Sequence, residues 1–207
     1  RDLMYCMIVT SANDAALNIA NAVAGNQAAF VEMMNQKAKL LGCTNTNFTN
    51  CHGLDAADQY TTARDAAKIT LGAPKSADLR EFFATKKYTV APTNRTEKER
   101  KLETSNHMMY EAILPQFYDK RVTGGMPSYA QGSGACLSCT AEADGMSLVV
   151  VVMGGSRTYN DNGNAKYYGN FEETQELLQM VFNNYRVCRL LYPGQMMDQF
   201  PVIGGND

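Results

Sequence analysis

The fold is decided by residues 135–154, which read ACLSCTAEADGMSLVVVVMG. Residues 135–141 and 146–153 have the composition of β-strands, and Asp144-Gly145 between them is a dipeptide typical of a tight hairpin turn. The run 148–153 is apolar at every position, so both faces of that strand are expected to be buried. The sequence therefore predicts an antiparallel hairpin whose second strand is central in a sheet and nearly inaccessible to solvent.

The first half of the chain is expected to be helical, because apolar residues recur there at helical spacing. Residues suited to helix capping stand before three of the segments: Asn26, Thr61 or Thr62, and Ser76. Gly25 and Gly42 follow the first two segments and are expected to end them. The expected helices are 13–24, 26–41, 61–71 and 76–83.

Residues 87–91 are expected to form a further strand, and the charged segment 92–103 an exposed hairpin arm. Together with the hairpin and the helices, these segments predict an α/β (α+β) fold.

A last helix is expected over 171–185, where Asn170 and Glu173 have capping-box spacing. Beyond it, 186–192 and 199–203 have the pattern of two short strands. Two strands do not make a stable domain alone. The sequence therefore predicts one domain over 1–185 and the start of a β-rich C-terminal module over 186–207.

The charge balance excludes several classes of partner. The 207 residues carry a formal net charge of -2, with a sequence pI of about 5.7. This gives no electrostatic basis for binding nucleic acid or an anionic membrane. The longest apolar run is far shorter than the roughly 20 residues that span a bilayer. With only His52 and His107, and no tight acidic cluster nearby, we expect no metal site and no cofactor.

The six cysteines leave one question open. Cys43 and Cys51 flank a polar loop and can form a disulfide or remain free thiols. Cys136 and Cys139 match the C-x-x-C pattern, but residues three apart on a strand point to opposite faces. They are therefore expected neither to chelate one metal nor to form a redox pair.

Five segments carry a family resemblance: TSANDAA (10–16), AAFVEMMNQKA (28–38), LGCTNTNF (41–48), HGLD (52–55) and YTTARD (60–65). In this order and at these spacings they closely resemble the low-molecular-mass penicillin-binding proteins, the serine D-alanyl-D-alanine carboxypeptidases. The resemblance covers nearly the whole chain. It implies the serine β-lactamase and penicillin-binding-protein (transpeptidase-like) fold, with its N-terminal part missing here. In that fold an antiparallel sheet is covered by helices, and the resemblance implies a helical subdomain from Ser11 to about Phe83. The β-lactamases share this fold, but the segment around His52 does not resemble theirs.

The resemblance implies three catalytic motifs, of which the second is intact. In Ser11-Ala12-Asn13, the family's Ser-x-Asn, Ser11 and Asn13 would assist proton transfer and hydrogen-bond the substrate; a plain helix cap is the alternative reading. The first motif, Ser-x-x-Lys, supplies the acylating serine and its lysine partner. No serine in this chain has a lysine three residues later, and the resemblance places that motif before Arg1.

The third motif, Lys-Thr-Gly, is altered. Residues 122–129 read VTGGMPSY, and an ungapped match puts Met126 at the lysine, Pro127 at the threonine and Ser128 at the glycine. These changes remove a positive charge, a hydroxyl and a backbone N–H. An alternative alignment uses residues 122–124, which keeps Thr-Gly and still loses the lysine. Arg157, just past the buried strand, either supplies a substitute charge or is an ordinary surface arginine.

The function implied by the resemblance is hydrolysis of the terminal D-Ala–D-Ala bond of peptidoglycan stem peptides through an acyl-enzyme, outside the cytoplasm. β-Lactams are expected as ligands once an upstream nucleophile is restored, and a membrane only through a missing C-terminal anchor. The chain as given lacks the nucleophile, so its activity is expected to be absent or severely impaired. The alternative is a non-catalytic paralogue that binds cell-wall peptide or a protein partner in the same cleft.

Overall fold

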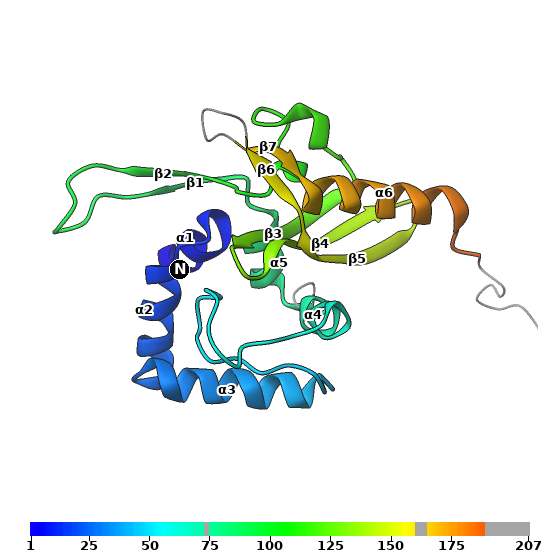
Figure 1. Ribbon diagram of the computed structural model, residues 1–207. Helices are drawn as coiled ribbons and strands as arrows, with labels where there is room; N and C mark the ends of the chain where they lie inside the picture. Colours follow the sequence, from blue (N-terminus) through cyan, green and yellow to red (C-terminus); the bar gives the residue numbers. More distant parts are fainter. Residues whose placement is uncertain (73–74, 160–164, 189–207) are drawn as a thin grey trace, which may run out of the picture.

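The computed structural model describes residues 1–72, 75–159 and 165–188, and Figure 1 shows how its helices and strands are arranged. The α-helices are α1 (Asp2–Thr10), α2 (Asn13–Ala24), α3 (Gln27–Leu40), α4 (Ala63–Thr70), α5 (Ala77–Ala84) and α6 (Gly169–Asn184). Two short 3₁₀ helices are η2 (His107–Met109) and η3 (Pro115–Phe117). The strands are β1 (Lys87–Val90), β2 (Arg100–Glu103), β3 (Val122–Ala130), β4 (Gly134–Ala143), β5 (Met146–Gly155), β6 (Arg157–Tyr159) and β7 (Ala165–Tyr168).

The predicted hairpin is present, with β4 and β5 paired antiparallel. Its turn residues, Asp144 and Gly145, have φ values of 51° and 76°. This left-handed conformation suits the right-handed twist of the flanking strands, and Asp and Gly adopt it readily. β3 pairs antiparallel with the other edge of β4, so the sheet order is β3-β4-β5.

The expectation that residues 148–153 form a central, nearly inaccessible strand is wrong, because β4 is the central strand of the described sheet. Within that run only Val150 and Val152 are buried, and Met153 is 39% exposed. One face of β5 packs on α6, whereas Val151, Val152 and Met153 border a large cavity. The apolar run thus correctly indicated that both faces of β5 are at least partly covered. It did not indicate which strand of the sheet pairs with another strand on each side.

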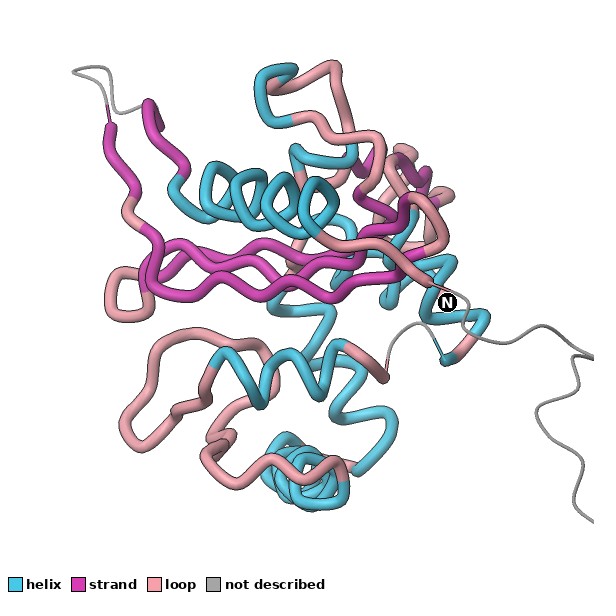
Figure 2. The backbone as a smooth tube through the Cα atoms, turned by 90° about the vertical axis from the view of Figure 1, so that its right-hand side faces the viewer, coloured by secondary structure: helices cyan, strands magenta, loops and turns pink. Residues whose placement is uncertain are grey.

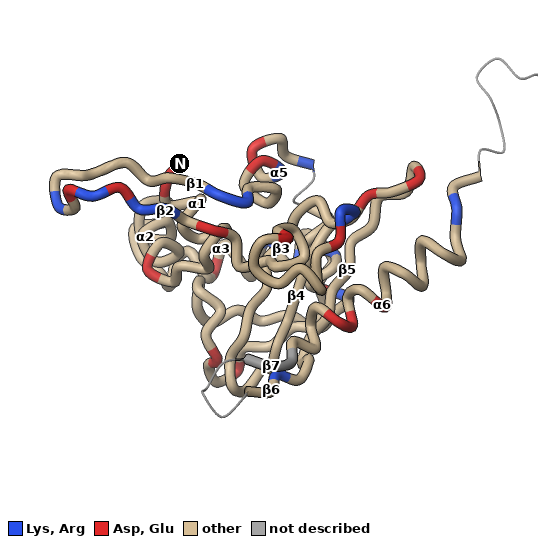
Figure 3. The backbone as a smooth tube through the Cα atoms, turned by 90° about the horizontal axis from the view of Figure 1, so that it is seen from above, with Lys and Arg blue, Asp and Glu red and all other residues tan. Residues whose placement is uncertain are grey.

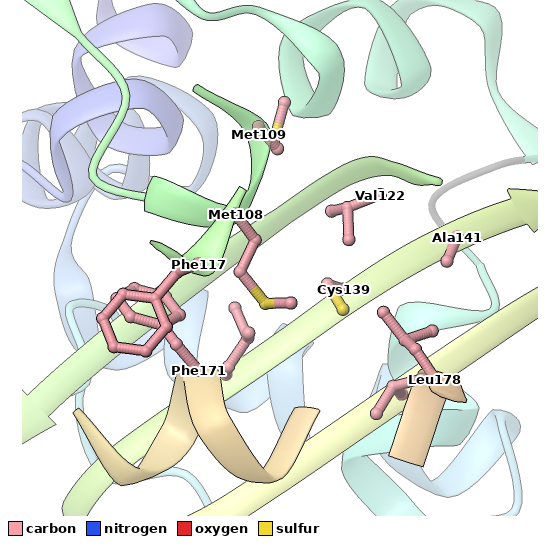
Figure 4. Packing of buried hydrophobic residues seen from close by; sticks show 10 residues of the cluster. Met108, Met109, Phe117, Val122, Cys139, Ala141, Phe171 and Leu178 are labelled. Carbon is pink, nitrogen blue, oxygen red and sulfur yellow. The ribbon is translucent and has the colours of Figure 1, made fainter. Parts of the chain in front are cut away.

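Helices cover both faces of the sheet, as expected for the α/β fold. α6 packs on β4 and β5, and α4 packs on the same strands from the opposite side (Figures 1 and 2). Alternate residues of β4 are fully buried and point toward α6. Figure 4 shows the resulting core, in which η2, η3, β3, β4 and α6 contribute Met108, Phe117, Val122, Cys139, Phe171 and Leu178.

The capping predictions in the first half are confirmed. The side chains of Asn26, Thr62 and Ser76 each accept a hydrogen bond from the backbone N–H three residues later, at 2.9, 3.2 and 3.4 Å. The capping box at Asn170 is wrong. α6 begins two residues earlier than predicted, at Gly169, so Asn170 lies within the helix. The Asn170 side-chain amide donates to the Cys136 carbonyl at 3.0 Å, which ties the helix to β4.

The charged segment 92–103 contributes to an exposed arm formed by β1 and β2, as expected. The two strands pair antiparallel, and every residue from 91 to 101 is exposed. Figure 3 shows lysine, arginine, aspartate and glutamate along the arm. Lys87 and Glu103 face each other across it and form an ion pair of 2.9 Å.

Cys43 and Cys51 are free thiols. The buried Cys43 thiol donates to the Asp65 carbonyl, and Cys51 lies 3.4 Å from Gln27 Oε1. On β4, Cys139 is buried in the core while Cys136 is partly exposed on the other face, as expected. Burial raises the pKa of the Cys139 thiol to about 12.

The predicted C-terminal module falls almost wholly outside the described residues. Its described part, residues 186–188, is exposed and belongs to no helix or strand. In the part of the chain that the structure describes, no helix combines the length and apolar character needed to cross a bilayer. The same residues contain no group of three or more side chains arranged to hold a metal ion.

Candidate functional site

A cavity of about 230 Å³ lies where the α1–α2 junction meets η2, β3, β6 and the start of α6. We call it the Ser11 cavity. Its walls combine hydroxyl, imidazole, guanidinium and amide groups with small apolar surfaces, and no aspartate or glutamate lines it. The lining residues are Ser11, Ser105, His107, Pro127, Ser128, Tyr129, Ala135, Arg157, Tyr168, Asn170 and Phe171.

Ser11 reaches the cavity because the chain turns sharply between α1 and α2. Ser11 has φ 55° and ψ 38°, a left-handed conformation that ends α1. The turn is closed by the Ala12 N–H, which donates to the Cys6 carbonyl at 3.2 Å, and by the Thr10 hydroxyl, which donates to the same carbonyl at 2.8 Å. Asn13 is the exposed first residue of α2 and does not line the cavity.

The three residues aligned with the altered third motif, Met126, Pro127 and Ser128, do not all face the same part of the molecule. They follow Gly124-Gly125 on β3, where a side chain at Gly125 would come within 2.5 Å of the Ser138 carbonyl oxygen. Pro127 and Ser128 line the cavity. Met126 is half-buried and packs instead against the cluster that α1 and α5 form with Tyr5 and Phe82.

Arg157 is held in place by three aromatic rings. Its guanidinium carbon lies 4.9 Å from the ring centre of Tyr129, 5.6 Å from that of Tyr159 and 5.0 Å from that of Tyr168. Cation–π contacts of this kind orient the guanidinium without neutralising its charge. No carboxylate of the described residues forms an ion pair with Arg157. The cavity therefore contains a fixed and uncompensated positive charge.

Four polar atoms on residues that line this cavity are buried without a hydrogen-bond partner among the described residues. They are Ser105 Oγ, His107 Nδ1, Arg157 Nε and Asn170 Oδ1. Asn170 Nδ2 already donates to the Cys136 carbonyl. Burial lowers the pKa of His107, and the charge of Arg157 lowers it further. Buried polar groups without partners are uncommon in folded proteins, so these four atoms have hydrogen-bonding capacity available for water or for a polar ligand.

Of the six residues that the sequence singled out, the cavity thus brings together Ser11, Pro127, Ser128 and Arg157. Sequence reasoning missed His107, Ser105 and Asn170. His107 was considered only as a metal ligand, and Asn170 only as a helix cap. One signal was available: the chain has two histidines, and His107 stands in the polar run Thr104-Ser105-Asn106-His107.

A second cavity, of about 740 Å³, lies between the polar loop 48–61 and the sheet. We call it the His52 cavity. Ser128 lines both cavities, which places them side by side along β3. The loop is joined to the β3–β4 turn by Asp55, whose Oδ2 accepts a hydrogen bond from the Gly132 N–H at 2.7 Å.

The comparisons with known proteins agree on one family. The family model described as D-alanyl-D-alanine carboxypeptidase matches residues 1–157. The D-alanyl-D-alanine carboxypeptidase DacA of Haemophilus influenzae is 32% identical over 99% of this chain and 47% of its own length. DacC of Escherichia coli is 36% identical over 74% of this chain and 35% of its own length. The chain thus spans less than half the length of these curated relatives.

A solved structure supports the same conclusion for the fold. Penicillin-binding protein 5 from Haemophilus influenzae superposes with a TM-score of 0.70 and 30% identity, over 88% of this chain and 47% of that one. The fold is therefore the one expected from the five segments, that of the penicillin-binding proteins. On the match of the family model to about three quarters of the sequence, the chain belongs to the D-alanyl-D-alanine carboxypeptidase family.

Proposed function

We propose that this chain is the peptide-binding part of a serine-type D-alanyl-D-alanine carboxypeptidase of cell-wall metabolism, acting outside the cytoplasm on peptidoglycan stem peptides. The Ser11 cavity carries the proposal. There, Ser11 of the Ser-x-Asn motif meets Pro127 and Ser128 of the altered third motif, together with Arg157. In this proposal residues 1–185 form the catalytic-type domain and 186–207 begin a second module.

Each site residue has a proposed role. Ser11, with Asn13 beside it in sequence, assists proton transfer and orients the substrate. Ser128 and Pro127 form the wall along which the peptide lies. Arg157 receives the terminal carboxylate, because Met126 carries no charge and packs on the α1–α5 cluster. An arginine is suited to this role because its planar guanidinium donates to a carboxylate with two parallel hydrogen bonds.

A second candidate function is peptide binding without hydrolysis. The observation that favours it is Pro127, which lies within β3 and has no N–H to donate to a substrate strand. A substrate aligned along β3 would lose one of the hydrogen bonds that fix its scissile bond. Such a loss reduces catalysis more than binding when the bond is formed mainly in the transition state.

The test is covalent labelling by a penicillin. We expect the 207-residue chain to form no adduct, because no serine in it has a lysine three residues later to activate its hydroxyl. Incubation with a fluorescent penicillin, followed by intact mass measurement, checks this, with Ser11→Ala as the matched control. Stoichiometric labelling that disappears in Ser11→Ala would contradict the role given to Ser11.

A longer gene product that contains a Ser-x-x-Lys distinguishes the two candidate functions, hydrolysis of the peptide and peptide binding without hydrolysis. The enzyme proposal expects slow labelling at that serine. Replacing Pro127→Thr and Ser128→Gly, the two motif positions that line the cavity, should accelerate it by about two- to tenfold, since a backbone N–H and a hydroxyl for the ligand are restored. No labelling before or after this replacement, with binding of the peptide retained, would support the binder.

A further inference from the structure

We propose that the exposed arm, residues 86–103, is a binding surface for a linear polymer that carries phosphate groups. The basic side chains that hold the polymer are those of Lys86, Arg95, Lys98 and Arg100. Residues 86–103 line neither the Ser11 cavity nor the His52 cavity, so this surface is independent of the function proposed for them.

The arm is basic although the chain as a whole is acidic. Residues 86–103 contain six lysines and arginines and three glutamates, whereas the 207 residues together carry a formal net charge of -2. The charge of the whole chain therefore conceals a local excess of positive charge. Figures 1 and 3 show the arm extending away from the rest of the molecule. A basic surface of this kind attracts polyanions even when the net charge of the protein is negative.

Most of the positive charge on the arm is free to meet an external anion. Lys87 pairs with Glu103 at 2.9 Å, and Lys101 pairs with Glu99 at 3.3 Å. Glu97 is then the one glutamate of the arm outside these two pairs. Four exposed basic side chains of the arm form no ion pair with any described residue: Lys86, Arg95, Lys98 and Arg100.

The base of the arm is fixed to α1. The Tyr88 ring stacks on the Tyr5 ring with 3.7 Å between their centres, and the Tyr88 hydroxyl donates to Asp2 Oδ1 at 2.6 Å. On the other strand, Ser105 directly after β2 donates its N–H to the Val9 carbonyl at 3.0 Å. Both strands are thus anchored to one helix before any ligand binds. An ordered surface loses less conformational entropy on binding than a flexible one.

The side chains of the arm exclude two other polyanionic partners. Proteins that hold single-stranded nucleic acid stack its bases on aromatic rings, and the single aromatic residue of the arm, Tyr88, is already stacked on Tyr5. Segments that bind a membrane surface insert large apolar side chains, and residues 91–101 contain none. The arm therefore fits a phosphate chain without bases and without a lipid surface.

Phosphate groups in a linear chain suit these four cations. Each phosphate carries its charge on the polymer backbone itself, so neighbouring charges are close enough for one strand to meet several cations of a narrow arm. A flexible strand can also follow the basic side chains and avoid Glu97. Arginine adds directionality, because its planar guanidinium donates two parallel hydrogen bonds to one phosphate.

Fluorescence anisotropy with end-labelled linear polyphosphate and the 207-residue chain tests the proposal. Each phosphate contact contributes about -0.7 to the slope of log affinity against log salt for a single strand. With about three or four contacts, we expect the affinity to fall by about 20- to 50-fold between 50 and 200 mM sodium chloride. No binding at 50 mM salt, or an affinity that salt does not change, would overturn the proposal.

Arg95→Gln, Lys98→Gln and Arg100→Gln together remove three of the four free cations. Affinity for polyphosphate at 50 mM salt should then fall by at least about tenfold. Because residues 91–101 are all exposed, the melting temperature of this variant should match that of the parent. A variant that melts like the parent and binds like it would refute the role of the arm.

The matched control removes the same charge elsewhere, at exposed helical positions, with Lys39→Gln, Arg64→Gln and Arg80→Gln. We expect it to change the affinity by less than about twofold, since these residues lie outside the arm. An equal loss of affinity in the two triple variants would show that only the net charge matters, which contradicts a defined binding surface.

The opposite change is predicted for Glu97→Gln, which removes a repulsive charge from the surface. Affinity at 50 mM salt should rise by about two- to fivefold. Glu176→Gln, at an exposed position of α6, should leave it unchanged. An affinity that Glu97→Gln does not raise would show that the polymer does not lie along the outer part of the arm.

The class of partner is tested with two further probes at matched phosphate concentration, oligodeoxythymidylate and vesicles of phosphatidylglycerol. We expect polyphosphate to bind at least as tightly as the oligonucleotide and more tightly than the vesicles. Tighter binding of the oligonucleotide would assign the arm to nucleic acid, and binding of the vesicles as tight as that of polyphosphate would assign it to a membrane surface. Either result would overturn the proposal.

Discussion

Ser11 belongs to the Ser-x-Asn motif, has a left-handed backbone conformation and lines the proposed substrate site. Its left-handed backbone turns α1 into α2 and brings the residue to the cavity, but an L-amino acid in this conformation carries strain of about 1–2 kcal/mol. Glycine would release the strain and would also increase the freedom of the unfolded chain. We therefore expect Ser11→Gly to raise the free energy of unfolding by up to about 1 kcal/mol.

Urea denaturation at fixed pH measures this change. The matched control is Ala22→Gly, at an exposed helical position of α2, which should lower stability by about 0.5–1 kcal/mol. A Ser11→Gly protein less stable than the parent would mean that the left-handed turn is not strained. A serine retained in spite of strain is consistent with a role for its hydroxyl.

Asp65 is a single residue that is expected to make the stability of the fold depend on pH. Its carboxylate is buried and accepts hydrogen bonds from the Asn45 N–H at 2.8 Å, from the Thr46 hydroxyl at 3.0 Å and from Lys68 at 3.0 Å. These bonds, the Asn45 N–H first, lower the pKa of Asp65 in the folded state. The carboxylate therefore stabilises the fold above its unfolded pKa of about 4, and this stabilisation is lost as pH falls through the lowered folded pKa.

Replacing Asp65 with asparagine should lower the melting temperature at pH 7. It should also flatten the decline of melting temperature below about pH 4, because the group that titrates is gone. Thermal melts from pH 7 to pH 2 measure both effects. Glu176→Gln, at an exposed position of α6, serves as the control and should follow the parent. An unchanged acid profile in Asp65→Asn would show that other carboxylates dominate acid unfolding.

At the scale of elements, local signals predicted local structure well. Asn26, Thr62 and Ser76 cap their helices, and Asp144-Gly145 turns the hairpin, because each of these depends on a few neighbouring backbone groups. The order of strands depends on pairing between distant segments. The apolar run of β5 contains no information about its partners, so its central position was predicted wrongly.

β5 nevertheless contributes to the core through Val150, which is 9% exposed and belongs to the cluster under α6. Replacing Val150 with aspartate would bury an unpaired carboxylate and should cost about 3–5 kcal/mol, or prevent folding. Ser147→Asp, at an exposed position of the same strand, should cost less than about 1 kcal/mol. Expression and thermal melts compare the two variants. A Val150→Asp protein that melts like the parent would show that this face of β5 is open to water.

At the scale of the whole molecule, the sequence predicted mainly those site residues that belong to a recognised motif. Ser11, Pro127 and Ser128 were found because a resemblance marks them, and Arg157 because it follows the strand. The inner wall of the cavity comes from η2 and α6, segments 63 residues apart in sequence at His107 and Asn170. No local pattern joins them. What brings them together is the packing of Met108 and Phe171 in one core.

The polar loop and the β3–β4 turn border the His52 cavity and are joined by a hydrogen bond between Asp55 and Gly132. These two residues lie 77 positions apart in the sequence. The carboxylate accepts the Gly132 N–H, and a side chain at Gly132 would come within 3.0 Å of that carboxylate oxygen. This charge-assisted bond holds the β3–β4 turn against the polar loop, and the turn in turn continues the strand that carries Ser128.

Removing the acceptor should therefore loosen the turn locally without unfolding the chain. We expect Asp55→Ala to increase hydrogen exchange in the peptide covering residues 131–134 by about two- to tenfold. This is the range for a bond of about 0.5–1.5 kcal/mol, since solvent exposure of the bond screens the carboxylate charge. Asp55→Asn keeps an acceptor at this position and should retain most of the protection. Glu142→Ala, at an exposed position of β4, should leave exchange in the turn unchanged. If all three variants exchange like the parent, the turn is held by its own strand pairing, and the bond across the His52 cavity contributes nothing to positioning β3.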